Sequence, residues 1–354
     1  MSNLSRQKLR AQKLRALFVG SAALAALAAS ALPGQAQGAL TLYCAVQEEW
    51  CRAMSTAFEK DTGIKVAMTR KSSGEIYAQV KAEASNPKGD VWWGGTGDPH
   101  LQAAEEGLSL ENTPAKPGEL HDWAVSVNKS SKNRTIGIYS GALGFGYNAK
   151  TLAARKLPEP KCWADLLKPE FKDEVQVADP NSSGTSYTLL ATIVQLMGED
   201  KGFAYMKGLH KNINQYTKSG AAPAKAVSLG ETTVGITFMH DMVAVAAENP
   251  DVKVVAPCEG TGYEIGSMSI IKGAKNLDSA RKFYDWALTP GPQALAAQNK
   301  QLQLQSNKAT PVAPNSPKLS DIKLIDYDFT KYGSSAERKR LLSKWDADVK
   351  SLPK

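Results

Sequence analysis

The feature that most constrains the fold is a regular alternation of short apolar segments with longer amphipathic ones. Residues 40–44, 64–69 and 90–93 have the character of strands, whereas residues 50–61 and 74–84 show helical spacing of apolar side chains. Alternation at these lengths is typical of parallel strands joined by crossover helices. The sequence therefore predicts an α/β fold in which helices cover both faces of a mostly parallel sheet.

A second block repeats this alternation after the proline-rich stretch 156–161. Strand-like runs at 175–178 and 234–238 are each followed by a polar turn or a helix start. A chain of 354 residues is long enough to build two domain-sized cores, so the two blocks predict two domains.

The segment between the blocks is predicted as three strands, at 124–127, 136–139 and 143–147. The last two are separated by Ser140-Gly141. Because a few flexible backbone positions can absorb a hinge rotation, this break is a candidate crossover between the domains. A β-bulge is the alternative interpretation of the same residues.

The first 36 residues have the composition of a secretory signal peptide. Basic residues without any acidic residue precede an apolar run at 16–32, and small residues follow it. The run is marginal for spanning a bilayer and is not repeated, so we expect a soluble, exported mature chain. Without this segment the 43 lysines and arginines fall by five to 38, against 35 acidic residues, which leaves a net charge of about +3. The remaining basic residues are dispersed, which argues against a nucleic-acid partner.

Four cysteines in an exported chain favour disulfides. Cys44 and Cys51 bracket the loop between the first strand and the first helix, so we favour a local bridge between them and a long-range bridge between Cys162 and Cys258. Two other pairings are compatible with the sequence, as are free thiols or a metal site. The sequence lacks the Cys-x-x-Cys spacing that would favour zinc.

Residues 89–100 combine an apolar run with a glycine-rich turn and a helix start. Gly94 and Gly95 allow backbone N–H groups to approach a ligand, and Thr96 adds a hydroxyl where α/β sheets bind their ligands. Ser72 and Glu75 have capping-box spacing at the preceding helix start.

Hydroxyl side chains at the turns between strands and helices recur in both blocks. They are Ser72, Ser73, Thr96, Ser183, Thr185 and Ser219. Helix N-termini have unpaired N–H donors and partial positive charge, so several of them converging on one cleft predict an anion site for phosphate or carboxylate. A single serine at such a position is more often only a helix cap.

His240, Asp241 and Glu264 offer donors and acceptors suited to sugar hydroxyls. They follow strand-like segments, as ligand contacts in α/β proteins do. The alternative is that Asp241 merely caps the helix after it. The histidines lack metal-ligand spacing, and hydrolase, nucleotide and dinucleotide fingerprints are missing from the sequence, so catalysis is not predicted.

The export signal, the two α/β blocks and the run at 90–100 resemble the periplasmic substrate-binding proteins of ABC importers, of the two-crossover (type II) kind grouped with ferric-ion binders. Four stretches are most similar to the AfuA-type hexose-phosphate-binding proteins, and these are 43–51, 69–75, 90–100 and 238–241. The resemblance covers nearly all of the mature chain and implies two lobes joined by crossover strands. The implied boundaries are 1–36 for the signal peptide, 37–141 with 267–354 for the first lobe, and 142–266 for the second.

The resemblance implies that a sugar phosphate lies between the lobes and is held by two groups of side chains. The phosphate would lie on Ser72, Ser73 and Thr96. The sugar would lie on His240, Asp241 and Glu264. Further candidates, assigned by their position in each block, are Glu48, Ser183, Thr185 and Ser219.

The resemblance further implies a monomeric periplasmic receptor that needs no cofactor and presents its ligand to a permease in the inner membrane. Ferric iron is the alternative ligand, but ferric-ion binders use two adjacent tyrosines, and this sequence has no such pair. A secreted sugar-phosphate phosphatase with His240 as acid or base is the alternative from another functional class.

Overall fold

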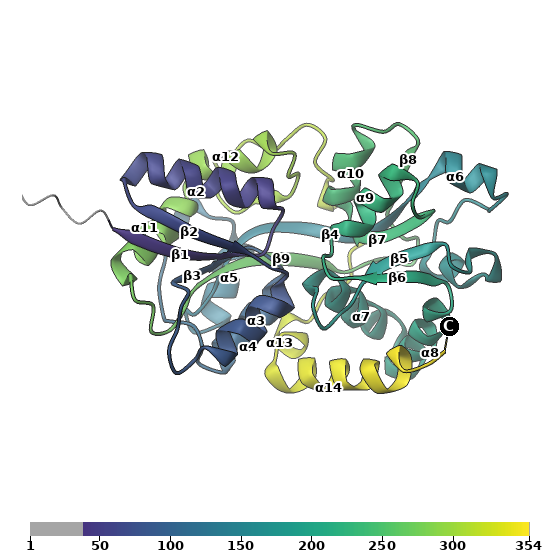
Figure 1. Cartoon of the computed structure of the whole chain (residues 1–354), viewed down its shortest axis with the longest axis horizontal. Helices are drawn as coiled ribbons and strands as arrows, with labels where there is room; N and C mark the ends of the chain where they lie inside the picture. The colour runs from purple at the N-terminus through teal and green to yellow at the C-terminus, as the bar shows by residue number, and fades with distance from the viewer. Residues whose placement is uncertain (1–37, 354) are drawn as a thin grey trace, which may run out of the picture. The chain divides into compact units, whose positions relative to one another are not determined.

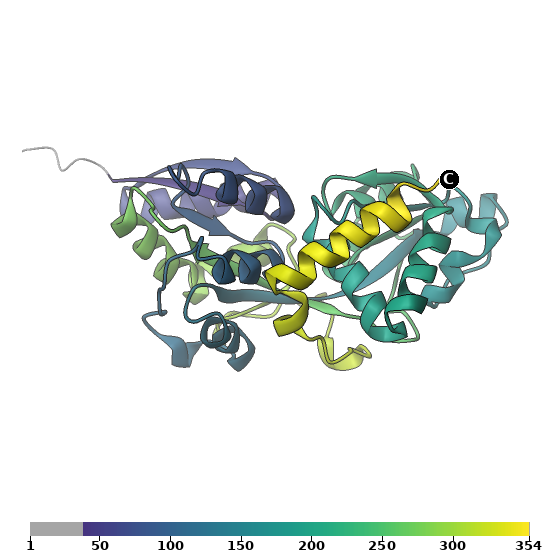
Figure 2. The same ribbon diagram turned by 90° about the horizontal axis from the view of Figure 1, so that it is seen from below.

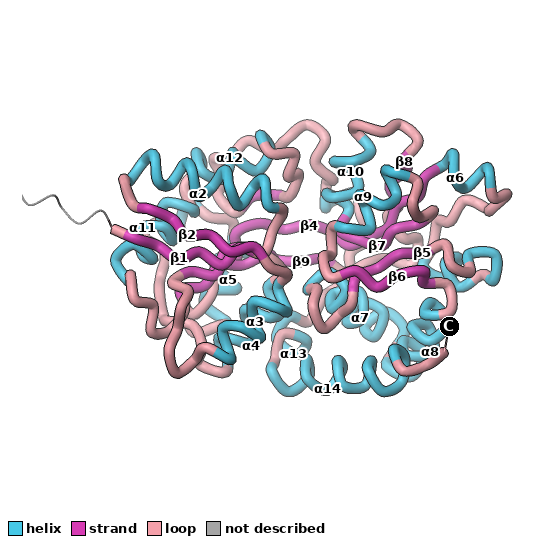
Figure 3. Tube along the Cα trace, in the orientation of Figure 1, coloured by secondary structure: helices cyan, strands magenta, loops and turns pink. Residues whose placement is uncertain are grey.

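In the computed structural model, which describes residues 38–353, the predicted alternation becomes one mixed sheet covered by helices (Figures 1 and 3). The predicted signal peptide lies outside the described residues. Within them the sheet has ten strands in the order β2-β1-β3-β9-β4-β7-β5-β6, with β8 and β10 paired to β4. The strands are β1 Ala39–Cys44, β2 Lys65–Arg70, β3 Val91–Trp93, β4 Ile136–Asn148, β5 Val175–Ala178, β6 Ile213–Thr217, β7 Val234–Phe238, β8 Val252–Val255, β9 Tyr263–Ile270 and β10 Leu304–Gln305.

Helices cover both faces of this sheet, as the α/β prediction requires (Figure 1). They are α2 Glu48–Thr62, α3 Ser73–Ala82, α4 Gly97–Glu105, α5 Asp122–Ser130, α6 Ala149–Ala154, α7 Gly184–Met197, α8 Glu199–His210, α9 Ala222–Leu229, α10 Met239–Ala246, α11 Leu277–Ala287, α12 Pro290–Gln298, α13 Phe329–Tyr332 and α14 Ser335–Trp345. In the part of the chain that the structure describes, none of these helices combines the length and apolar character needed to cross a lipid bilayer.

Parallel strands form the two ends of the sheet, and long antiparallel strands join them. β1 pairs in parallel with β2 and β3, and β5 pairs in parallel with β6 and β7. Between these ends, β4 pairs antiparallel with β9 through its first half and with β7 from Leu143 onward. The break predicted at Ser140-Gly141 is therefore wrong, because β4 continues through it, but the strand changes partners directly after these residues.

The strand predicted at 124–127 is also wrong, because these residues lie inside α5. Ala124 and Val127 are buried, and their spacing of three residues places both on one face of a helix. A run of four residues is too short to reveal this periodicity.

Each half of the sheet has its own hydrophobic core. In the first half, Trp50 packs edge-on against Trp93 with ring centroids 4.9 Å apart. The core of the second half includes Leu341 and Trp345 of α14. Figure 2 shows α14 in yellow extending from the first half of the sheet to the second.

Two disulfides form in the pairing that the sequence favoured. Cys44 is bonded to Cys51, and Cys162 is bonded to Cys258. The first bridge joins the end of β1 to the first turn of α2 and so fixes the loop that contains Gln47. This loop forms part of the cavity described below.

Candidate functional site

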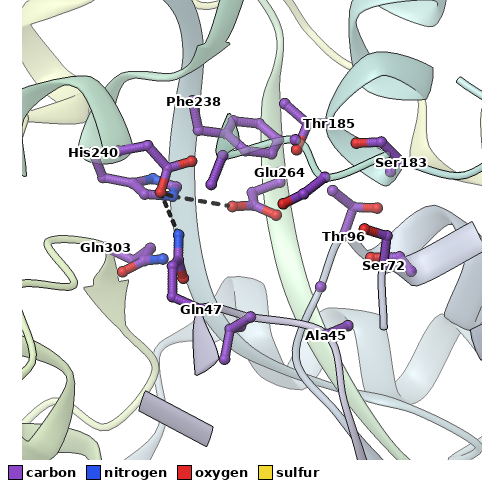
Figure 4. Close-up of a pocket in the computed structure, with 18 of the residues that line it drawn as sticks. Ala45, Gln47, Ser72, Thr96, Ser183, Thr185, Phe238, His240, Glu264 and Gln303 are labelled. Carbon is purple, nitrogen blue, oxygen red and sulfur yellow. Dashed lines mark hydrogen bonds and ion pairs between the residues drawn. The ribbon is translucent and has the colours of Figure 1, made fainter. Parts of the chain in front are cut away.

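A buried cavity lies where the carboxyl ends of the parallel strands from the two halves of the sheet face each other (Figure 4). Helices from both halves begin at residues that line it, and these are Gln47, Ser72, Thr96, Ser183, Ala221 and Phe238, which precede α2, α3, α4, α7, α9 and α10. Converging N-termini give the cavity a field that favours an anion.

One side of the cavity carries hydroxyl groups. Figure 4 shows Ser72 and Thr96 from the first half of the chain facing Ser183 and Thr185 from the second. The side chains of Thr96 and Ser183 do not cap the helices that they precede, so their hydroxyls can serve a ligand. This side therefore presents donors suited to the oxygens of a phosphate group.

The glycine turn before Thr96 does not leave its N–H groups free for a ligand as predicted, because the N–H of Gly94 donates to the Ser267 carbonyl at 2.9 Å and that of Gly95 also donates within the protein. Gly94 and Gly95 have φ angles of 81° and 83°, in the left-handed region that favours glycine. The N–H of Gly95 donates a 2.8 Å hydrogen bond to the hydroxyl of Tyr139, a cavity residue on β4. This bond fixes the turn that positions Thr96.

Hydrogen bonds cross from one half of the chain to the other around the hydroxyl side. The N–H of Gly74 donates to the Ser182 carbonyl at 3.0 Å, and the Ser72 hydroxyl donates to the Lys218 carbonyl at 3.0 Å. The Arg70 guanidinium donates to the Ser219 hydroxyl at 3.3 Å. These bonds hold the two halves together over the cavity, so the structure represents a closed form.

His240 lies across the cavity from these hydroxyls, with Glu264 between it and them (Figure 4), and Asp241 also lines the cavity. Nε2 of His240 is 3.8 Å from a carboxyl oxygen of Asp241 and 3.8 Å from one of Glu264. The three side chains are only 4%, 9% and 3% exposed, respectively. Burial raises the pKa of both carboxyls, that of Glu264 well above its ordinary range, and lowers the pKa of the imidazole. The cluster can therefore offer neutral donors and acceptors to ligand hydroxyls.

Several cavity side chains have buried polar atoms without a hydrogen-bond partner among the described residues. They are Thr96 Oγ1 on the hydroxyl side and Gln47 Oε1, His240 Nδ1 and Gln303 Oε1 on the other. An unpaired buried polar atom costs on the order of 1–3 kcal/mol. Such atoms around a single cavity favour a polar ligand that would pair with them.

The structure brings the predicted hydroxyl residues and the His240–Asp241–Glu264 group together at this cavity. Glu48 is not among the residues that line it. Glu48 is the first residue of α2, and its exposed side chain forms an ion pair with Arg52 one turn later. Sequence neighbours of a cleft residue can thus point away from the cleft.

Sequence reasoning did not assign Arg70, Tyr139 and Gln303, which also line the cavity. Arg70 ends β2 directly before Lys71 and Ser72, so the strand-end rule that selected Ser72 would also have found it. Tyr139 lies within β4 and Gln303 lies just before β10, and a local signal for either is lacking in the sequence.

Comparisons with known proteins agree with this architecture. Residues 100–332 match the family model described as bacterial extracellular solute-binding protein. An uncharacterized protein of Haemophilus influenzae is 43% identical over 94% of this chain and 97% of its own. The periplasmic binding protein AfuA of Actinobacillus pleuropneumoniae, solved with fructose-6-phosphate bound, has a TM-score of 0.85 and 43% identity, covering 90% of this chain and 100% of its own. The periplasmic binding protein P5PA has a TM-score of 0.85 and 38% identity, with 88% and 99% coverage.

Proposed function

Because the chain belongs to the family of bacterial extracellular solute-binding proteins, we propose that it is the periplasmic solute-binding component of an ABC importer and captures a hexose phosphate. The ligand class is glucose 6-phosphate or a closely related sugar phosphate. The similarity to AfuA, which was solved with fructose-6-phosphate bound, supports this class.

The observation that carries the proposal is the division of one cavity into two chemically different sides. The hydroxyl side, at the N-termini of α3, α4 and α7, suits a phosphate because its donors and helix dipoles all favour negative charge. Arg70 adds a positive charge at the edge of the same cavity. The side with His240, Asp241 and Glu264 suits the several hydroxyls of a sugar.

The closed form supports the expected transport role. Residues 37–141 with 267–354 and residues 142–266 would form the two lobes, with α14 attached to both. Ligand binding would stabilise the closed form, which the permease of the importer then recognises. The protein would act in the periplasm as a monomer after removal of residues 1–36.

A thermal-shift series tests the proposal, because a ligand that binds only the folded protein stabilises it. At one hundred times the dissociation constant, glucose 6-phosphate should add about 2.7 kcal/mol to the free energy of unfolding and raise the melting temperature by several degrees. Glucose and inorganic phosphate each satisfy only one side of the cavity, so each should have little effect.

Two outcomes would contradict the proposal, one in the thermal-shift series and one in an assay of phosphate release. A large shift with ferric citrate and none with sugar phosphates would indicate an iron carrier. Release of inorganic phosphate from glucose 6-phosphate, lost in His240→Ala, would indicate a phosphatase. The parent protein without ligand is the reference for each arm.

A further inference from the structure

The hydroxyl of Thr237 contacts two oxygen atoms behind the cavity. Thr237 is fully buried near the end of β7, and its Oγ1 lies 2.8 Å from the Gly220 carbonyl oxygen and 3.0 Å from Oδ2 of Asp241. A threonine hydroxyl has a single hydrogen, and a carbonyl oxygen can only accept. If that hydrogen is donated along the shorter contact to Gly220, the contact with Asp241 requires a hydrogen from the Asp241 carboxyl itself.

The other oxygen of Asp241 agrees with this assignment. Oδ1 of Asp241 accepts a hydrogen bond from the side-chain amide of Gln47 at the start of α2. A protonated carboxyl has one oxygen that accepts and one that donates, which matches the two partners Gln47 and Thr237. We propose that Asp241 carries a proton in the site and donates it to Thr237, so that the sugar-facing side presents a neutral acid to an anionic ligand.

The charged and titratable groups around Asp241 determine whether its carboxyl is protonated or ionised. Glu264 on β9 and Tyr139 on β4 are acidic groups, and His240 is its neighbour on α10. His240, the hydrogen-bonding contacts with Thr237 and Gln47, and Arg70 on β2 all favour the ionised carboxylate and lower the pKa of Asp241, in that order of size. Burial opposes the charged form and raises the pKa of Asp241, and it also holds His240 in the neutral form.

A neutral Asp241 explains how a cavity with two carboxyl groups can accept a phosphate ester. Two carboxylates at Asp241 and Glu264 would repel a dianion in a space that excludes most water. Protonation of Asp241 removes its share of that repulsion, and burial raises the pKa of Glu264 well above its ordinary range, which favours the neutral form there too. Because the pKa of Asp241 is raised, the binding form predominates below that pKa, and affinity should fall as the pH rises through it, by at most about tenfold per pH unit for one proton.

Carbon-13 NMR of the Asp241 carboxyl carbon tests the assignment in the ligand-free full chain, with the resonance identified by its loss in Asp241→Asn. The parent should titrate above the ordinary aspartate pKa of about 3.9. Thr237→Val removes the acceptor of the Asp241 hydrogen and should move the midpoint down, whereas Thr237→Ser should keep it near the parent value. An upward shift in Thr237→Val would overturn the inference, because it would mean that threonine donates to an ionised carboxylate.

The effect on binding is measured with glucose 6-phosphate, and this second step rests on the proposed function. The parent and Asp241→Asn share the titration of the phosphate group, so the difference between their pH profiles isolates Asp241. We expect the loss of affinity at rising pH to be smaller in Asp241→Asn, and identical slopes would contradict the inference.

Absence of glucose 6-phosphate binding would contradict the proposed function, while the NMR midpoints would still decide the protonation of Asp241. If Thr237→Val does not fold, the parent midpoint itself decides, and a midpoint below neutral pH overturns the inference, because Asp241 would then be ionised in neutral solution.

Discussion

Replacing Gly74 with alanine should weaken glucose 6-phosphate binding by roughly fivefold to a hundredfold or more, which corresponds to about 1–3 kcal/mol for a steric clash in a packed contact. Gly74 lies in the first turn of α3 and makes backbone contact with the opposite half of the chain. An added Cβ would overlap the Asn181 carbonyl oxygen and press on that of Ser182. These are backbone atoms, so the closed form cannot relieve the clash by rotating a side chain.

The stability of the ligand-free variant separates a defect in closure from a defect in folding. The clash of Gly74→Ala arises between the two halves, and alanine is a better helix former than glycine, so the melting temperature without ligand should not fall. Gly118→Ala is a matched control, because an added Cβ there meets no atom of residues 38–353 within 4 Å. Calorimetric titration of both variants measures the effect, and parent-like affinity in Gly74→Ala would show that the ligand does not require this closed form.

Asp241→Ala should reduce the affinity for glucose 6-phosphate by roughly fivefold to a hundredfold or more, from the loss of about 1–3 kcal/mol when a ligand hydroxyl remains unpaired in a closed cavity. The helix-capping alternative is weakened by the structure, since Phe238 occupies the capping position of α10 and Asp241 pairs with Gln47 and Thr237 instead. Folding should therefore change little.

Asp122→Ala provides the control for that substitution, because Asp122 is an exposed aspartate in the first turn of another helix, α5. It should bind like the parent. Isothermal calorimetry and melting of the two variants without ligand test the prediction. An Asp241→Ala protein that melts lower and binds as tightly as the parent would remove Asp241 from the site.

The α/β class was predictable because apolar periodicity along the chain reports the elements directly. Ser72 and Thr96 were predictable for a related reason, since residues after strands and before helices gather at one edge of a sheet. His240 and Glu264 are separated in sequence and meet only in the fold; they were grouped because both follow strand-like segments, and the family resemblance implied their shared role in binding the sugar. The pairing of Cys162 with Cys258 was favoured because the short loop between Cys44 and Cys51 suited a local bridge.

The features that the sequence did not reveal depend on tertiary contacts. Gln303 reaches the cavity only because the segment before β10 is placed there by pairing of β10 with β4. The direction in which the Glu48 side chain points could not be predicted from the sequence either. Its neighbour Gln47 lines the cavity, whereas Glu48 faces Arg52 and solvent. The position of α14 on the second core depends on Leu341 and Trp345, whose partners come from distant segments.

The most direct test of the central claim is a crystal structure of the protein grown with glucose 6-phosphate. Electron density should show the phosphate group among Ser72, Thr96, Ser183 and Thr185, and the sugar hydroxyls next to His240, Asp241 and Glu264. A phosphate group placed beside Asp241 and Glu264, or a sugar phosphate bound outside this cavity, would contradict the account.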